Sequence, residues 1–199
     1  MSDRLRGPRH VVLVGLMGSG KTTVGKKVAK LLGVRFVDAD VELEARTGRS
    51  VADWFAAEGE AGFRRAEADL LTSLLEDAEP SVIGAGGGVV VQADNRRRLK
   101  GTGATVVYLH GEPGFLAARV QKKPHRPLLE GRDPAQLFDD MYERRDPWYR
   151  EVADVVVEVR PHHEAGSKPK WRIAESVVDA LEERGDVRRV APENEVEVR

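Results

Sequence analysis

Residues 15–22 read Gly-Leu-Met-Gly-Ser-Gly-Lys-Thr and match the pattern Gly-x-x-x-x-Gly-Lys-[Ser/Thr] at every fixed position. An apolar, β-branched run at 10–14 precedes them, and residues 21–32 carry apolar side chains at helical spacing up to Gly33, a helix stop. A glycine-rich turn between a buried strand and a helix lets backbone N–H groups and the helix dipole face a phosphate. The segment therefore predicts a phosphate-binding loop (P-loop) for a nucleoside triphosphate.

The polar residues of this loop have distinct expected tasks. We expect Lys21 to reach the β- and γ-phosphates of ATP and the Thr22 hydroxyl to ligate Mg²⁺. Further nucleotide contacts are expected from Gly18, Ser19, Gly20 and Thr23. The pattern predicts nucleotide binding but does not indicate what happens to the phosphate after binding.

Other short apolar runs predict four more strands, and helical spacing recurs between them. The predicted strands cover residues 34–37, 81–85, 105–109 and 155–159. Helical patterns cover residues 60–75, 134–146 and 171–183, and Pro147 is expected to end the second. Strands that alternate with helices predict an α/β fold. We expect a three-layer α/β/α arrangement with a mostly parallel five-stranded sheet, the P-loop NTPase fold.

The chain is long enough for one domain with short extensions. We expect a polar lead at residues 1–9, one domain over residues 10–184 and a disordered, charged tail at residues 185–199. Within the domain, the proline- and glycine-containing stretch 160–170 is predicted to be a surface loop.

Composition excludes several classes of protein. The 199 residues hold 32 Lys plus Arg and 33 Asp plus Glu, a net charge of −1, whereas a general nucleic-acid binder needs a basic excess. The absence of cysteine excludes disulfides, thiolate metal sites and a cysteine nucleophile. No apolar run approaches the ~20 residues of a membrane span, and the first residues lack a signal-peptide pattern. We expect a cytoplasmic protein, monomeric, with no nucleic-acid or membrane partner.

Two acidic residues follow the predicted strand 34–37. Asp38 and Asp40 lie where ligands sit in parallel sheets, beyond the carboxyl end of a strand. One carboxylate is suited to holding Mg²⁺ through water, and the other to binding a substrate hydroxyl and taking its proton. Asp40 is equally suited to capping a helix that starts at Val41. Spacing alone does not decide between these roles.

A glycine triplet and two arginines suggest a second ligand. Gly86, Gly87 and Gly88 end the strand 81–85 and would let a ligand approach the backbone, or form a flexible turn. Arg64 lies three residues before Glu67, a spacing typical of a solvated helix pair or of an oriented guanidinium. Arg145 continues an apolar helical stripe, where it either grips a carboxylate or snorkels over apolar surface.

The basic, proline-rich segment 122–133 separates two helices. Its residues are typical either of a solvated connection or of a lid that closes over the nucleotide. As a lid it would place Arg126 on the transferring phosphoryl group.

Several motifs in this order resemble those of the shikimate kinases, from about His10 to Val159. Beyond the P-loop, the resemblance rests on Asp38-x-Asp40, Arg46-Thr47-Gly48, Phe55…Gly59-Glu60…Phe63-Arg64, the glycine triplet, Arg126-Pro127-Leu128-Leu129 and Arg144-Arg145-x-Pro147-x-Tyr149. It implies a kinase domain that transfers the γ-phosphoryl group of MgATP to the 3-hydroxyl of shikimate, on the route to chorismate and aromatic amino acids.

The same resemblance implies a role for each matching residue. It makes Lys21, Asp40 and Arg126 catalytic, with Asp38 and Thr22 near Mg²⁺. It assigns the shikimate carboxylate to Arg64 and Arg145. The rest of the acceptor site is implied to be Phe55, Phe63, Gly86, Gly87 and Gly88, and Arg119 is implied to stack on adenine.

Two other functions remain open on the sequence. Gly84 and Ala85 stand where relatives often carry a hydroxyl residue, and Trp148 stands where a smaller side chain is usual. The same differences are compatible with a paralogous kinase that phosphorylates another small carboxylate or polyol, such as gluconate. A nucleotide-binding switch without an acceptor would leave Asp40 and Arg145 unexplained.

Overall fold

The computed structural model describes residues 10–121 and 133–189. Its centre is a five-stranded, wholly parallel sheet in the order β2-β3-β1-β4-β5. The strands are β1 His10–Val14, β2 Arg35–Asp38, β3 Ser81–Gly84, β4 Thr105–His110 and β5 Val155–Glu158. Each differs from its predicted range by no more than one residue at either end, and the predicted five-stranded α/β fold is confirmed.

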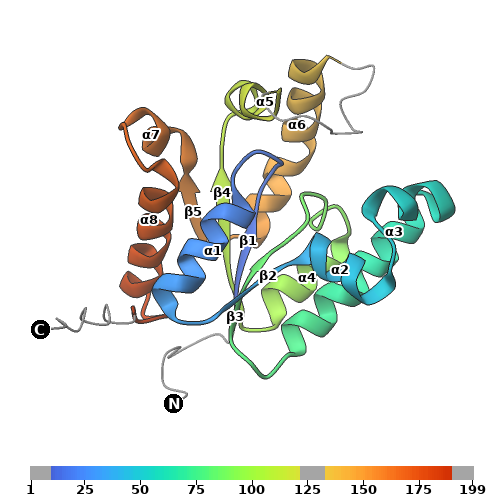
Figure 1. Cartoon of the computed structure of the whole chain (residues 1–199), viewed down its shortest axis with the longest axis horizontal. Coiled ribbons are helices and arrows are strands. Elements are labelled where there is room, and N and C mark those ends of the chain that lie inside the picture. Colours follow the sequence, from blue (N-terminus) through green and yellow to red (C-terminus); the bar gives the residue numbers. More distant parts are fainter. Residues whose placement is uncertain (1–9, 122–132, 190–199) are drawn as a thin grey trace, which may run out of the picture.

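Helices cover both faces of the sheet, so the fold has the three predicted layers. The helices are α1 Lys21–Leu32, α2 Ala39–Thr47, α3 Val51–Glu76, α4 Ala93–Gly101, α5 Pro113–Gln121, α6 Pro134–Val152, α7 Val159–Glu164 and α8 Pro169–Glu183. Helices α1 and α8 pack together on one face, while α3, α4 and α6 lie on the other (Figure 1). The connection from β1 to α1 lies at the carboxyl edge of the sheet, the edge at which the strands end.

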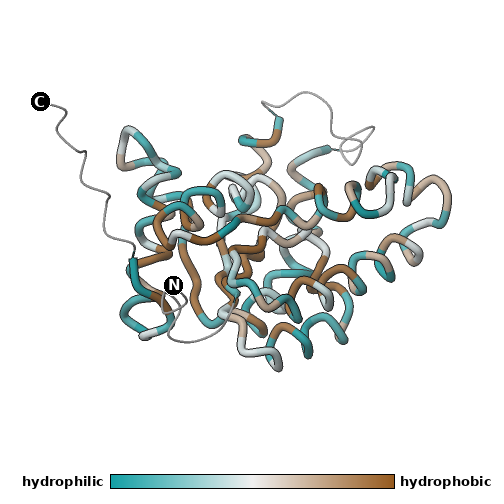
Figure 2. The backbone as a smooth tube through the Cα atoms, turned by 60° about the horizontal axis from the view of Figure 1, so that its bottom comes forward, coloured by the Kyte–Doolittle hydropathy of each residue, from teal (hydrophilic) through white to brown (hydrophobic). Residues whose placement is uncertain are grey.

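The core explains why the strands lack polar alternation. All residues of β1, β3 and β4 are buried, because helices cover both faces of these central strands. Figure 2 shows hydrophobic residues concentrated along the middle of the domain, with hydrophilic residues on the outer turns. Because this core holds the strands in place, the loops at the carboxyl edge of the sheet start from fixed positions.

Two local predictions were wrong. Pro147 does not end its helix, since α6 continues to Val152 with the proline inside it. Residues 160–164 of the predicted loop 160–170 lie in α7, and residues 169–170 lie in α8. The predicted helix 60–75 is confirmed as the second part of α3, which begins at Val51 and is kinked at Gly59, where φ is 66°.

The end of the described chain also packs on the domain. Val187 is 3% exposed, and Asp186 accepts a hydrogen bond from Thr105 Oγ1 at 3.2 Å. Residues 185–189 therefore pack with the domain, although the sequence assigns them to the tail. The predicted lead 1–9, the rest of the tail 190–199 and nearly all of the predicted lid, including Arg126, lie outside the described residues.

The Phe36 ring fills a slot between α1 and β3 that two glycines create. A Cβ at Gly25 would overlap the ring and lie 3.1 Å from Leu13 Cδ1, and a Cβ at Gly84 would lie 3.1 Å from Phe36 Cζ. Packing therefore explains the glycine at position 84, because the Phe36 ring lies against the space that a hydroxyl side chain would need.

We expect Gly25→Ala to destabilise the protein by about 1–3 kcal/mol, because overpacking a core costs about that much. In a chain of this size that lowers Tm by about 2–12 °C. Thermal unfolding of Gly25→Ala, Phe36→Leu and the double variant checks this, and the double variant should recover part of the loss. Gly101→Ala is the control, because a Cβ there meets nothing within 4 Å. Equal Tm values for Gly25→Ala and Gly101→Ala would contradict the claim that the Phe36 ring leaves no room for a side chain at position 25.

Candidate active site

The P-loop is held open by glycines in conformations that other residues rarely adopt. Gly15, Gly18 and Gly20 have φ angles of 142°, 84° and 107°. A Cβ on Gly15 would lie 2.6 Å from Leu109 O, so this turn also needs the missing side chain to pass β4. The loop leads directly into α1, whose N-cap is Gly20. Backbone N–H groups and the helix N-terminus can thus face one anion.

Two side chains of the loop are positioned for phosphate oxygens. Lys21 Nζ donates to Gly15 O at 2.7 Å and to Leu16 O at 3.2 Å, which keeps the ammonium against the loop. The Ser19 hydroxyl is buried and has no hydrogen-bond partner in the described part of the chain. A buried polar atom without a partner costs about 1–3 kcal/mol, so a ligand oxygen here would be favourable. Thr23 lies one residue further along α1 than Thr22.

Thr22 and Asp38 form a small oxygen-rich site at the start of α1. The Thr22 hydroxyl donates to Asp38 Oδ2 at 2.7 Å. Asp38, not Asp40, is the N-cap of α2, because its Oδ1 accepts from the Asp40 N–H at 3.2 Å. No three His, Cys, Asp or Glu side chains within residues 10–121 and 133–189 gather as a metal cage. One hydroxyl and one carboxylate beside a phosphate loop suit Mg²⁺, which takes few protein ligands.

The glycine triplet brings together the other candidate residues. A Cβ at Gly86 would lie 2.6 Å from Glu67 Oε1 and 3.1 Å from Asp40 Oδ1, and one at Gly88 would overlap the Arg64 guanidinium. At Gly87 a Cβ would lie only 3.6 Å from Gly15 O, in the P-loop. The triplet therefore forms a bare backbone wall with charged side chains on one side and the P-loop next to it.

Arg64 is a buried cation with a fixed orientation. It is 9% exposed, and its NH1 donates to Glu67 Oε2 at 2.7 Å. Glu60 Oε1 lies 3.2 Å from its NH2. Although burial opposes the charged form, the ion pair with Glu67 raises the pKa of Arg64, so the guanidinium stays charged. The spacing of Arg64 and Glu67 thus marks an oriented guanidinium instead of a solvated pair.

Glu67 lies among the same candidate residues, although we expected it only to orient Arg64. It is 5% exposed, and its Oε1 has no hydrogen-bond partner among the described residues. Burial raises the pKa of Glu67, while Arg64 opposes the rise. Asp40 and Arg145 also act on this pKa, which places both charges near the same carboxylate.

Arg145 and Tyr149 reach the wall from α6, one helical turn apart. Arg145 NH1 donates to Gly87 O at 3.2 Å, and the Tyr149 hydroxyl donates to the same oxygen. Burial raises the pKa of Tyr149, so the phenol remains a donor. Because α6 continues past Pro147, both side chains lie on one rigid helix. The sequence missed Tyr149, whose spacing four residues after Arg145 was the available signal.

Two phenylalanines lie beside Arg64. The rings of Phe55 and Phe63 are 5.0 Å apart, and the Arg64 guanidinium lies 5.2 Å from the Phe63 ring. Phe63 is buried, whereas Phe55 is 37% exposed. The pair offers an apolar surface next to a cation.

Arg119 lies on the other side of the P-loop from the triplet. Its Nε donates to Gly18 O at 2.9 Å, which ties α5 to the loop. His163 on α7 accepts from its NH1 at 2.6 Å. The structure thus places the predicted adenine residue beside the P-loop and adds His163, which the predicted loop 160–170 did not reveal.

Trp148 has a packing partner away from the triplet. Its ring lies 5.0 Å from the Arg96 guanidinium on α4, and Arg96 also pairs with Glu151 at 2.9 Å. The large side chain therefore fills the contact between α4 and α6, which explains its size without a different acceptor.

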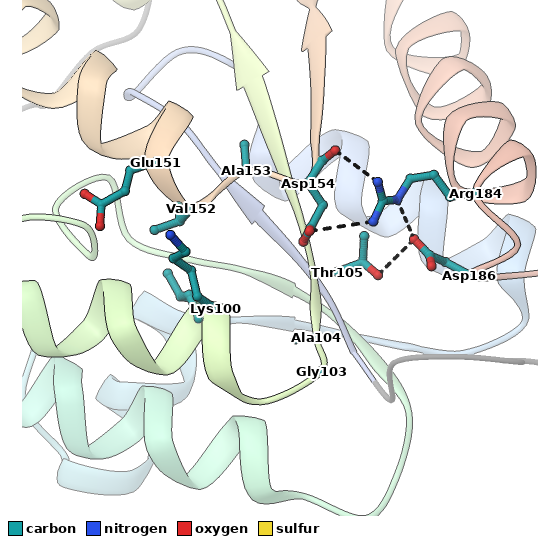
Figure 3. A pocket seen from close by; sticks show the side chains of 11 residues that line it. Lys100, Gly103, Ala104, Thr105, Glu151, Val152, Ala153, Asp154, Arg184 and Asp186 are labelled. Atoms are coloured by element: carbon teal, nitrogen blue, oxygen red, sulfur yellow. Dashed lines mark hydrogen bonds and ion pairs between the residues drawn. The ribbon is translucent and has the colours of Figure 1, made fainter.

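A pocket of about 390 Å³ lies at the opposite edge of the sheet, near the start of β4 (Figure 3). Among its lining residues, Arg184 pairs with Asp186 at 2.9 Å and with Asp154 at 3.6 Å. These charges compensate one another, and the pocket is remote from the P-loop. In the described part of the chain, every helix is too short or too polar to cross a lipid bilayer.

Comparison with known proteins identifies the family. The shikimate kinase family model matches residues 17–182. A shikimate kinase from Burkholderia lata is 48% identical over 149 residues, 75% of this chain and 80% of that protein. One from Aromatoleum aromaticum is 49% identical over 148 residues, 74% of this chain and 83% of that protein.

Comparison with solved structures points to the same family. The shikimate kinase from Acinetobacter baumannii in complex with shikimate has a TM-score of 0.79 and 36% identity, covering 88% of this chain and 93% of that one. A gluconokinase from Sinorhizobium meliloti 1021 has a TM-score of 0.53 over 90% of this chain and 96% of that one, but at 22% identity it shares the fold alone. This chain belongs to the shikimate kinase family.

Proposed function

We propose that this protein transfers the γ-phosphoryl group of MgATP to the 3-hydroxyl of shikimate, giving shikimate 3-phosphate and ADP. The observation that carries the proposal is the wall at Gly86–Gly88, where Arg64, Arg145 and Asp40 gather next to the P-loop. A phosphate donor and an anionic acceptor could therefore meet across Gly87. Family membership and the relative solved with shikimate support the same acceptor.

On the donor side, we assign the triphosphate to the P-loop. Backbone groups from Gly18 to Gly20 and the Ser19 hydroxyl accommodate phosphate oxygens, and Lys21 moves from Gly15 O to the phosphates. Thr23 contributes at the start of α1. Thr22 and Asp38 would hold Mg²⁺, which when bound neutralises phosphate charge.

On the acceptor side, we assign the shikimate carboxylate to Arg64 and Arg145. Two guanidiniums near one buried wall match a carboxylate, because each can form paired charge-assisted hydrogen bonds. Phe55 and Phe63 offer the apolar contact for the ring. Asp40 accepts a hydrogen bond from the hydroxyl that will react.

The transfer then needs positioning and charge stabilisation more than a strong base. The hydroxyl oxygen of the acceptor forms a bond to the γ-phosphorus, and the bond to the oxygen bridging the β- and γ-phosphates breaks. Asp40 takes the hydroxyl proton, and ADP leaves with the electron pair of the broken bond. Lys21 stabilises the charge on the phosphoryl oxygens.

An assay of ADP release with MgATP tests this function. We expect ADP only when shikimate is added, with little release in the presence of gluconate. Release that is equal with the two acceptors, or absent with shikimate, would contradict the assignment. We further propose that the enzyme acts in the cytoplasm as a monomer without nucleic-acid or membrane partners, consistent with a net charge of −1.

A further inference from the structure

Three side chains form a cluster on the side of the P-loop that faces α5 and α7. Arg119 NH1 lies 2.6 Å from His163 Nε2 and 3.0 Å from His163 Nδ1. The Phe115 ring lies 5.5 Å from the His163 ring and 5.4 Å from the Arg119 guanidinium. Arg119 is therefore held from three directions, because its Nε also donates to Gly18 O.

The order of the strands separates this cluster from the acceptor wall. Asp38 and the glycine triplet follow β2 and β3, whereas α5 and α7 follow β4 and β5, on the other side of β1. Figure 1 shows α5 and α7 at the same end of the sheet as the β1–α1 connection. If the γ-phosphate faces Gly87, the side of the P-loop toward α5 is left for the rest of the nucleotide. A Cβ at Gly18 would lie 2.9 Å from Val120 Cγ2, so α5 packs tightly on the loop.

We propose that His163 is a positioning residue, which orients Arg119 so that its guanidinium can contact the nucleobase of ATP. The inference rests on the proposed function, since it assumes that ATP is the donor. His163 is suited to this task because a neutral ring can accept a hydrogen bond from a guanidinium. Burial and the charge of Arg119 lower the pKa of His163 to about 4, so the ring is neutral at pH 7.

The alternative is that Arg119 only supports the P-loop through Gly18 O. The two roles differ in what the loss of His163 would change. If Arg119 serves the base, binding of a phosphate chain without a base is unaffected. If Arg119 serves the loop, every ligand of the loop binds less tightly.

The test compares MgATP with magnesium tripolyphosphate, a ligand that has the phosphates but no base. We expect His163→Ala to weaken MgATP binding about three- to tenfold, the effect of one hydrogen bond, and to leave tripolyphosphate binding unchanged. The KM for ATP should rise by the same factor, with kcat and the KM for shikimate unchanged. His163→Gln should restore ATP binding, because its amide oxygen can accept the hydrogen bond.

His162→Ala is the matched control, since His162 lies next in α7 but contacts Ser176 Oγ at 3.3 Å. We expect it to bind both ligands as the wild type does. Equal weakening of tripolyphosphate in His163→Ala, unchanged ATP binding, or an equal effect of His162→Ala would overturn the role of His163. A wild-type protein that does not bind MgATP would instead overturn the proposed function.

Discussion

Replacing Gly88 with alanine is expected to weaken shikimate binding about ten- to a hundredfold. The new Cβ would overlap the guanidinium of Arg64, which its hydrogen bond to Glu67 holds in place at 2.7 Å. The backbone itself accepts alanine, because the φ angle of Gly88 is not among the positive ones. Displacing Arg64 removes a charge-assisted contact worth roughly 1.5–3 kcal/mol, which gives the expected range.

Titration of Gly88→Ala with shikimate and with an ATP analogue measures the effect. Affinity for the analogue should change less than twofold, since Arg64 lies on the acceptor side of the wall. Gly114→Ala is the control, because a Cβ there meets nothing within 4 Å. Normal shikimate affinity in Gly88→Ala would mean that Arg64 does not bind the acceptor.

Arg145→Ala is expected to lose a similar share of its shikimate affinity, and Arg145→Lys should not restore that affinity. Arg145 NH1 already donates to Gly87 O at 3.2 Å, so the guanidinium needs its other N–H groups for the acceptor carboxylate. A lysine ammonium is a point charge and cannot form the paired contacts of the guanidinium. We expect the Kd for shikimate to rise about ten- to a hundredfold in both variants, while binding of an ATP analogue is retained.

Arg144→Ala controls for the loss of a cation from the same helix. Arg144 is exposed, and its Nε donates to Asp140 O within α6. Its removal should leave both affinities unchanged. Full affinity in Arg145→Lys, or an equal loss of ATP binding, would show that Arg145 is a structural or phosphate-side residue.

Local patterns in the sequence were enough to predict the sheet and the P-loop. The range of α1 and its end at Gly33 follow from apolar spacing and a glycine stop, both of which act over a few residues. The end of α6 could not be predicted in this way. Packing of Tyr149 and Val152 in the core outweighs the cost of Pro147 inside the helix.

The residues that the sequence missed depend on contacts between distant segments. Tyr149 reaches Gly87 across 62 positions, and His163 reaches Arg119 across 44. No periodicity predicts such pairs, because they arise only when the sheet brings the ends of different strands together. Arg64 and Glu67 were recognised as a pair because they are three residues apart, but their burial needed the structure.

The slot around Phe36 couples positions that are remote along the chain. A side chain larger than hydrogen would overlap the Phe36 ring at position 25 and would press on the ring at position 84. The three positions are therefore coupled through the aromatic ring. Adding a hydroxyl near Thr22 and Asp38, the residues proposed to hold Mg²⁺, by Gly84→Ser alone would push on Phe36 and, through it, on the first turns of the helix that begins at the P-loop. An engineer who wants that hydroxyl should start by shrinking Phe36.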